Sequence, residues 1–248
     1  MDERVAVEIV EHVAVVRLAR PAKHNALDLA MFRALRDAAT TLAGEPAVRA
    51  VVLHGEGPSF CSGLDVRAAS AGELDPAVLL DRPAGEAANL AQSVAFGWRE
   101  LPVPVIAAVH GACFGGGLQI ALGADVRIAA PDARLSVMEI TLGLIPDMAL
   151  TVTLPPLVRL DVAKELTWTG RVVDGHEAQR LGLVTRVDAD PLAAARALAG
   201  EIAARSPQAI RAAKALLHAA WDAPPAESLR LETEHVRGLF DTAGSPLP

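Results

Sequence analysis

The amino-acid sequence predicts an α/β protein with a helical C-terminal region. Residues 48–55 are mostly apolar and residues 103–109 wholly so, which is typical of strands buried on both faces of a sheet. Helical patterns separate the strand patterns along the chain, as in folds whose sheet is covered by helices. From about residue 190 only helical patterns remain. We therefore expect an α/β core over residues 1–189 and a distinct helical region over residues 190–248.

The first elements follow from local patterns. Residues 5–10 and 12–19 are rich in β-branched side chains, so they predict two strands that could pair through a short turn. Residues 27–44 have apolar side chains at helical spacing, an early aspartate and a terminal glycine, and predict a helix. After the strand at 48–55, the polar and weakly patterned stretch from residue 56 to about 85 is expected to be rich in loops.

The rest of the core repeats the alternation of helix and strand. The elements expected are, in order, a helix over 86–100, a strand over 103–109, a helix over 116–123 and strands over 125–130 and 134–137. Three further helices are expected over 190–204, 206–221 and 225–240, because prolines interrupt the pattern at Pro191, at Pro207 and at the pair Pro224–Pro225.

Composition limits the class of protein. The chain is 52% hydrophobic and 21% charged with a net charge of −7, which favours a buried core and disfavours disorder or a nucleic-acid partner. The most apolar region, residues 101–130, is interrupted by prolines, glycines and polar residues before it reaches the roughly 20 residues of a membrane span. The two cysteines have no metal or redox spacing and no secretory signal is visible, so we expect a reduced cytoplasmic protein without a metal site.

Three consecutive glycines, Gly115–Gly117, stand between an expected strand and an expected helix. Glycine inside a helix costs about 1 kcal/mol relative to alanine, so three at a helix start need a reason. Free N–H groups without side chains around them suit a phosphate or a developing oxyanion. A turn that only serves packing explains an isolated triplet equally well. A second glycine turn at 60–65 also follows a strand, and together the two turns could donate to a single oxygen.

Five stretches of the chain resemble the enoyl-CoA hydratase/isomerase (crotonase) family, in the family's order and over most of the sequence. They are NAL (25–27), SFCSGLD (59–65), PVIAAVHGACFGGGLQIALGADVRIA (104–129), LSVMEITLGLIPD (135–147) and LTWTGRVVDGHEAQRLGLVTRV (166–187). The resemblance implies a spiral of ββα units followed by C-terminal helices that mediate trimerisation. It also implies an acyl-CoA thioester as substrate, with coenzyme A as part of that substrate and no separate cofactor.

The same resemblance implies that the two glycine turns form one oxyanion hole. Its donors would be the backbone N–H groups of Leu64 and Gly116, which would hold the thioester oxygen as it gains enolate charge. Each such donor is typically worth about 3 kcal/mol of barrier. Arg20 and Lys23 match the family's basic segment near the CoA phosphates. The residues expected along the neighbouring nucleotide and pantetheine path are Cys61, Ser62, Gly63 and Asp65.

Hydratases of the family carry two glutamates, at the positions that Gln119 and Glu139 occupy here. Hydration needs groups that orient a water and move its proton, and an amide cannot take that proton at neutral pH. Moving a double bond needs one base, which Glu139 could be by itself. We therefore expect an isomerase that uses Glu139 as acid and base. The alternative for Glu139 is a surface acid at a strand end.

A third acid, Asp147, lies eight residues after Glu139. Dienoyl-CoA isomerases of the family have aspartate there and hydratases have glycine, so Asp147 could share a proton shuttle with Glu139. Its alternative is the N-cap of a helix over 148–154. Acyl specificity is expected near Met148 and in residues 66–90.

Two other functions stay open. One is hydration or dehydration of an enoyl-CoA with Gln119 and Glu139 positioning the water, and the other is non-catalytic binding of acyl-CoA. In each case the expected assembly is a homotrimer or a dimer of trimers.

Overall fold

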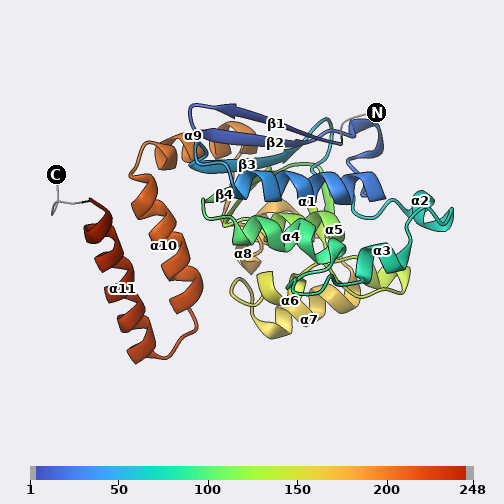
Figure 1. Cartoon of the computed structure of the whole chain (residues 1–248). Coiled ribbons are helices and arrows are strands. Elements are labelled where there is room, and N and C mark those ends of the chain that lie inside the picture. The colour runs from blue at the N-terminus through green and yellow to red at the C-terminus, as the bar shows by residue number, and fades with distance from the viewer. Residues whose placement is uncertain (1–3, 244–248) are drawn as a thin grey trace.

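The computed structural model describes residues 4–243, and the main sheet of these residues has six strands (Figure 1). Their spatial order is β1, β2, β3, β4, β6, β8; β1 and β2 are antiparallel and all other neighbours are parallel. The strands are β1 (Val5–Val10), β2 (Val13–Leu18), β3 (Ala50–Gly55), β4 (Val105–Val109), β6 (Val126–Ala129) and β8 (Arg186–Val187). Every residue of β3 and β4 is buried, as expected for central parallel strands.

A second, smaller sheet lies beside the first and carries the glycine triplet at its end. It pairs β5 (Ala112–Phe114) with β7 (Arg134–Ser136) in parallel. Helix α5 (Gly116–Leu122) starts two residues after β5 and all of its residues are buried. The triplet therefore lies inside the protein.

Helices cover both faces of the main sheet. On one face α1 (Leu29–Ala43) and α4 (Leu90–Glu100) lie side by side, and on the other face α9 (Pro191–Ala203) packs on β3, β4 and β6 (Figure 1). Each face has its own apolar core, a large one under α1, α4 and α5 and a smaller one under α9. The α/β class and the helical C-terminal region predicted from the sequence are confirmed.

The weakly patterned part of the chain contains short elements that the sequence pattern did not specify. Residues 56–85 include the one-turn helices α2 (Val66–Ser70) and α3 (Pro76–Leu80). The helix expected from residue 86 starts at Leu90, because Asn89 and Gln92 form a capping box there. The remaining short elements are η1 (Pro21–Lys23), η2 (Glu139–Leu142), α6 (Leu150–Thr153), α7 (Leu160–Thr169) and α8 (Gly175–Leu181).

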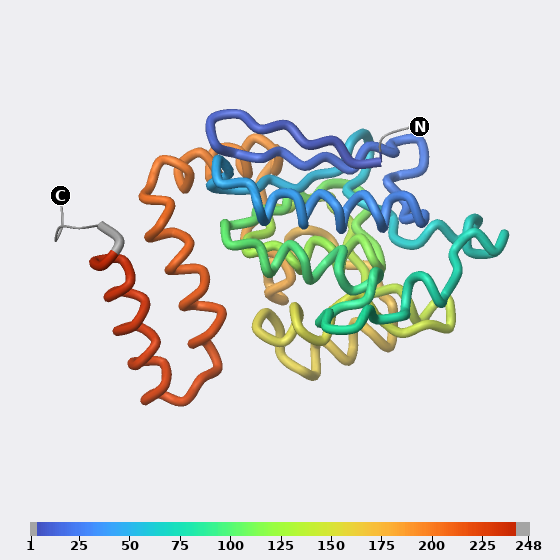
Figure 2. The backbone as a smooth tube through the Cα atoms, in the orientation of Figure 1, coloured from blue at the N-terminus to red at the C-terminus, as the bar shows by residue number. Residues whose placement is uncertain are grey.

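The last two helices leave the body of the protein as a hairpin, which we call the C-terminal arm (Figure 2). It consists of α10 (Pro207–Ala220) and α11 (Pro225–Ala243). The two helices pack extensively on each other, while α10 is tied to the body by Lys214, whose Nζ lies 2.7 Å from Asp125 Oδ2 and 3.0 Å from the Val103 carbonyl oxygen. The division at residue 190 stays a prediction; α9 lies on the sheet and the arm lies beyond it.

No helix within residues 4–243 is long and apolar enough to cross a membrane.

Candidate active site

The two glycine turns lie next to each other because the chain segments that carry them run in parallel. Cys61 pairs with Cys113 in a parallel bridge, and the Cys61 carbonyl accepts the Phe114 N–H at 3.0 Å. Three residues beyond this bridge the two segments reach Leu64 and Gly116. The register of the bridge thus brings together two positions that are more than fifty residues apart in the sequence.

The backbone N–H groups of Leu64 and Gly116 are both free. Neither donates a hydrogen bond to any residue in the range 4–243. In the second glycine turn, the groups on either side of the Leu64 N–H are bonded to Leu27, whose N–H donates to the Gly63 carbonyl and whose carbonyl accepts the Asp65 N–H. The intervening Leu64 N–H therefore points away from Leu27, toward the segment of Gly116. A Cβ built on Gly63 would lie 3.6 Å from the Gly116 nitrogen, so the two turns are in close contact.

Each glycine of the triplet has a different close neighbour. A Cβ on Gly117 would lie 2.3 Å from the Cys61 carbonyl oxygen, which is backbone and cannot move aside. A Cβ on Gly116 would lie 2.7 Å from the Met148 Sδ. Gly115 has φ of +50°, and a Cβ there would lie 3.3 Å from Glu139 Oε1. The triplet therefore allows close approach of a loop, a side chain and a carboxyl group to one stretch of backbone.

Glu139 is buried beside this backbone and bound to Gln119. Its side chain comes from η2 and is 8% exposed, so the surface alternative for Glu139 is wrong. Gln119 Nε2 donates to Glu139 Oε1 at 2.6 Å, and Gln119 Oε1 accepts the Met148 N–H at 2.9 Å. Glu139 Oε2 is also buried and accepts no hydrogen bond from the described residues.

The electrostatic environment favours the neutral form of Glu139. Burial raises the pKa of its carboxyl, the Glu139 backbone amide and Gln119 lower it, and the charge of Asp147 raises it further. A carboxyl group with a raised pKa can accept a proton and return it near neutral pH.

Asp147 lies near Glu139 but is open to solvent. Partial desolvation by neighbouring atoms raises the pKa of its carboxyl. Its alternative role as a helix N-cap is wrong, because α6 starts at Leu150 and its N-cap is Ala149, with φ of +67° and no side-chain cap. Asp147 is thus a second carboxyl at the rim of the same site.

Two of the residues expected to bind coenzyme A have internal partners. Arg20 donates to Asp65 Oδ2 at 2.7 Å and to the Ala26 carbonyl at 3.0 Å, and it also pairs with Asp28 at 3.4 Å. Asp65 in turn caps the N-terminus of α2. These bonds give both residues a structural role, because they hold the second glycine turn against the start of α1.

The other expected residues differ in their access to solvent. Cys61 is fully buried, its thiol donates to the Asn25 carbonyl, and burial raises the pKa of that thiol to about 12. Ser62 is half-buried and Lys23 is exposed, with no ion pair to any described residue. Of this group Lys23 has the charge best placed for an anionic ligand.

Two roles at the site were not predicted from the sequence, one of the Asn25 side chain and one of the Met148 backbone. Asn25 is fully buried, and its Nδ2 contacts the carbonyl oxygens of Glu56, Ser59 and Phe60, which holds the loop before the second glycine turn. Its place in the NAL motif was the sequence feature from which this role could have been inferred. Met148 supplies the N–H that orients Gln119, a backbone role that no residue pattern announces.

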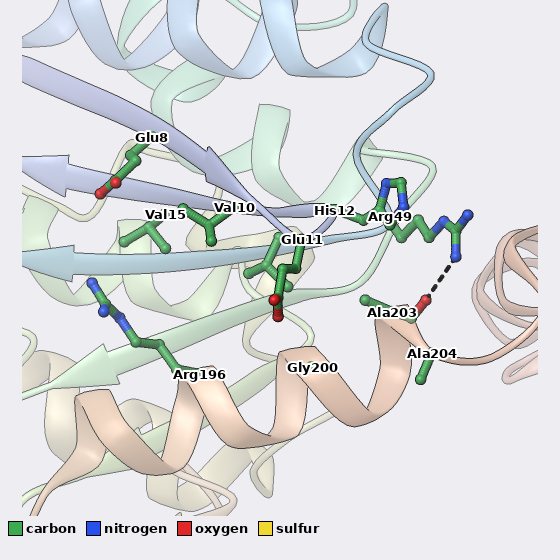
Figure 3. A pocket seen from close by; sticks show the side chains of 11 residues that line it. Glu8, Val10, Glu11, His12, Val15, Arg49, Arg196, Gly200, Ala203 and Ala204 are labelled. Atoms are coloured by element: carbon green, nitrogen blue, oxygen red, sulfur yellow. Dashed lines mark hydrogen bonds between the residues drawn. The ribbon is translucent and has the colours of Figure 1, made fainter.

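The hollow in Figure 3 lies elsewhere, between the β1–β2 hairpin and α9. It measures about 450 Å³ and is lined by charged side chains of both signs, among them Glu8, Arg49 and Arg196. Arg49 closes one end by donating to the Ala203 carbonyl at 3.1 Å. None of the residues assigned above to the candidate site lines this hollow. Within residues 4–243 no three His, Cys, Asp or Glu side chains cluster as metal ligands would.

Comparison with known proteins gives one consistent result. The family model for enoyl-CoA hydratase/isomerase matches residues 8–245. YngF of Bacillus subtilis, named an enoyl-CoA hydratase/isomerase, is 37% identical over 225 residues, which are 90% of this chain and 84% of that protein. The mitochondrial Delta(3,5)-Delta(2,4)-dienoyl-CoA isomerase of Mus musculus is 35% identical over 88% of this chain and 69% of its own.

A solved structure supports the same conclusion. A Thermobifida fusca protein described as an enoyl-CoA hydratase, in complex with CoA, superposes with a TM-score of 0.84 at 33% identity, covering 98% of this chain and 95% of that one. The fold is therefore the crotonase fold, as the resemblance implied. The chain belongs to the enoyl-CoA hydratase/isomerase family.

Proposed function

We propose that the protein is an enoyl-CoA isomerase that shifts a double bond in an acyl-CoA thioester. The observation that carries the proposal is the juxtaposition of two free backbone N–H groups, those of Leu64 and Gly116, with the unpartnered Oε2 of the buried Glu139. Gly115 connects them, because it precedes Gly116 and lies against the Glu139 carboxyl. Such an arrangement suits removal of a proton next to a carbonyl group whose oxygen is stabilised at the same time.

The proposed reaction has two steps. Glu139 removes a proton from a carbon beside the thioester carbonyl, and the electron pair moves onto the carbonyl oxygen. The N–H groups of Leu64 and Gly116 bind this oxygen and stabilise its charge by about 3 kcal/mol each. Glu139 then returns the proton to another carbon of the chain, and the double bond forms in its new place. The reaction needs no cofactor, since coenzyme A is part of the substrate.

The presence of Asp147 supports a second candidate function, the same kind of reaction on a related substrate. It is a solvent-accessible carboxyl whose charge acts on Glu139, and the dienoyl-CoA isomerase relative is named for a longer conjugated system. A second carboxyl could receive or supply a proton at a more distant carbon of such a substrate. Coenzyme A would extend past Ser62 and Gly63 toward the exposed Lys23, which would contact a phosphate.

The proposal is tested with two substrates. We expect a 3-enoyl-CoA to be converted to the 2-enoyl isomer, and crotonyl-CoA to be hydrated slowly or not at all, both followed by thioester absorbance. Rapid hydration of crotonyl-CoA would show instead that Gln119 and Glu139 position a water. If no acyl-CoA is converted but one binds, the protein is a binding protein.

We also propose a homotrimer, or a dimer of trimers, in the cytoplasm. The C-terminal arm exposes large apolar side chains, with Leu217 54% and Leu229 62% exposed, and Trp221 in the turn between its two helices is 69% exposed. An apolar groove of about 610 Å³ also separates α10 from the body. Surfaces of this kind are typical of subunit interfaces. Light scattering is expected to give the mass of three or six chains, and a monomer would contradict the proposal.

A further inference from the structure

The side-chain amide of Gln119 can take only one orientation. Its Oε1 accepts the Met148 N–H and its Nε2 donates to Glu139 Oε1. If the amide were turned over, two N–H groups would face each other at Met148 and two oxygens would face each other at Glu139. Gln119 is 1% exposed, so water could not satisfy the groups that lost their partners. The Met148 N–H therefore determines which end of the amide faces Glu139.

This orientation makes the two oxygens of Glu139 unequal. An amide N–H can only donate, so Oε1 must be an acceptor whether Glu139 is charged or neutral. A neutral carboxyl group has a single O–H, and its carbonyl oxygen is a better acceptor than its hydroxyl oxygen, so the hydrogen bond from Gln119 to Oε1 favours the proton on Oε2. That oxygen is buried and has no partner among the described residues.

We propose that Gln119 is a positioning residue that confines the exchangeable proton of Glu139 to Oε2, so that Oε2 alone takes and returns the substrate proton. The inference rests on the proposed function. In the first step the substrate C–H bond breaks, Oε2 receives the proton and the electron pair passes to the thioester oxygen. In the second step the Oε2–H bond breaks, a new C–H bond forms and the pair becomes the shifted double bond. No co-reactant is consumed.

The backbone around Met148 supports this role. Ala149 has φ of +67°, a left-handed conformation that non-glycine residues adopt rarely and that is concentrated at functional sites. The same turn directs the Met148 N–H to Gln119 and packs the Met148 sulfur against Gly116. One turn thus orients the amide beside the base and contacts the proposed oxyanion donor.

Few charged groups can disturb the titration of Glu139. Helix α5 presents the uncharged Gln119, and the turn after η2 presents Asp147, whose charge reaches Glu139. Helix α7 also packs on η2, but its charged side chains are engaged elsewhere: Glu165 pairs with Arg171, Asp161 with Arg159, and Lys164 lies over the Trp168 ring. The hydrogen bond from Gln119 favours the charged form of Glu139, so its loss must move the titration to higher pH.

The experiment measures the titration of Glu139 directly, by carbon NMR of protein labelled at the glutamate carboxyl groups. Glu139→Gln identifies the resonance. Gln119→Met keeps the length of the side chain and removes the donor, and we expect the Glu139 midpoint to move to higher pH, with the acid limb of kcat/KM moving with it. Gln119→Glu is the second variant: two carboxyl oxygens at this distance share a proton, so the midpoint again moves upward.

The matched control is Thr153→Val. Thr153 is buried and its hydroxyl donates to the Ala149 carbonyl at 3.2 Å, so the change loosens the same region without touching Glu139. We expect it to leave the midpoint and the acid limb unchanged. An unchanged midpoint in both Gln119 variants, or an equal shift in the control, would overturn the inference. Because the NMR titration needs no turnover, a shifted midpoint in a protein that converts no enoyl-CoA would support the positioning role and refute the proposed function alone.

Discussion

The candidate site and the C-terminal arm differ in how closely their residues are packed. At the site, segments from separate parts of the chain pack closely, and a single added methyl group on Gly117 would reach 2.3 Å from a backbone oxygen. In the arm, α11 packs on α10 and leaves Leu229 62% exposed. The proposed catalytic groups lie on closely packed segments of the core, whereas the arm has an exposed apolar surface that another molecule could cover. Substitutions in the two regions should therefore have different consequences.

The largest effect is expected at the base. Glu139→Gln removes the group that takes the proton and keeps its size, so kcat should fall on the order of 10³-fold, while assembly by light scattering stays the same. The exposed Glu232→Gln in the arm is the control and should change neither. Full activity of Glu139→Gln would refute its role as the base.

A steric change at the site should come next. Gly117→Ala forces a Cβ against the Cys61 carbonyl, so we expect a loss of about 3 kcal/mol in the free energy of unfolding together with a lower kcat, because Leu64 and Gly116 are moved apart. The control is Gly200→Ala in α9, where a Cβ meets no atom within 4 Å; there alanine should stabilise by about 0.5–1 kcal/mol. Equal unfolding curves for the two variants would contradict the close packing described above.

A smaller effect is expected where the arm is attached. Asp125→Asn leaves the ammonium of Lys214, which is 8% exposed, without its carboxylate. Loss of one partner of a fully buried pair costs about 3–5 kcal/mol; since the Asp125 side chain is 21% exposed, we expect about 2 kcal/mol. The variant should associate more weakly in sedimentation at low concentration but convert substrate at the same kcat when assembled. If a variant at the candidate site weakened association as much as Asp125→Asn does, the two regions would not differ in their effect on assembly.

The smallest effect is a pH dependence of stability. The pKa of Glu139 is raised in the folded protein above its ordinary value of 4.5, so between these two pKa values the folded state binds more protons than the unfolded state. The free energy of unfolding therefore falls as pH rises through this interval. Glu139→Gln has no carboxyl group to titrate here, so in denaturant titrations its free energy of unfolding should rise relative to that of the unmodified protein as pH increases above 4.5, the ordinary pKa of the carboxyl. Parallel curves would indicate that Glu139 is not desolvated.

Much of this fold could be predicted from local patterns. Strands 5–10 and 103–109, the helix that ends at Gly44 and the three C-terminal helices all appear within a few residues of their expected bounds, since period and caps are properties of neighbouring residues. The segment 137–189 was harder, because its helices are short and lie on a surface formed by other parts of the chain. The direction in which the arm leaves the body was not predictable, since its contacts with the body join residues far apart in sequence, such as Lys214 with Asp125 and Arg211 with the Val48 carbonyl.

The sequence by itself determined the family and the α/β class and supplied the candidate residues of the site, because these depend on residue types in a fixed order. Tertiary structure alone decided what each residue does there. Arg20 and Asp65 hold each other, Glu139 is buried and not at the surface, and Gln119 donates a hydrogen bond to this proposed base. These roles follow from distances between segments that are far apart in sequence, and burial and hydrogen bonding depend on those distances.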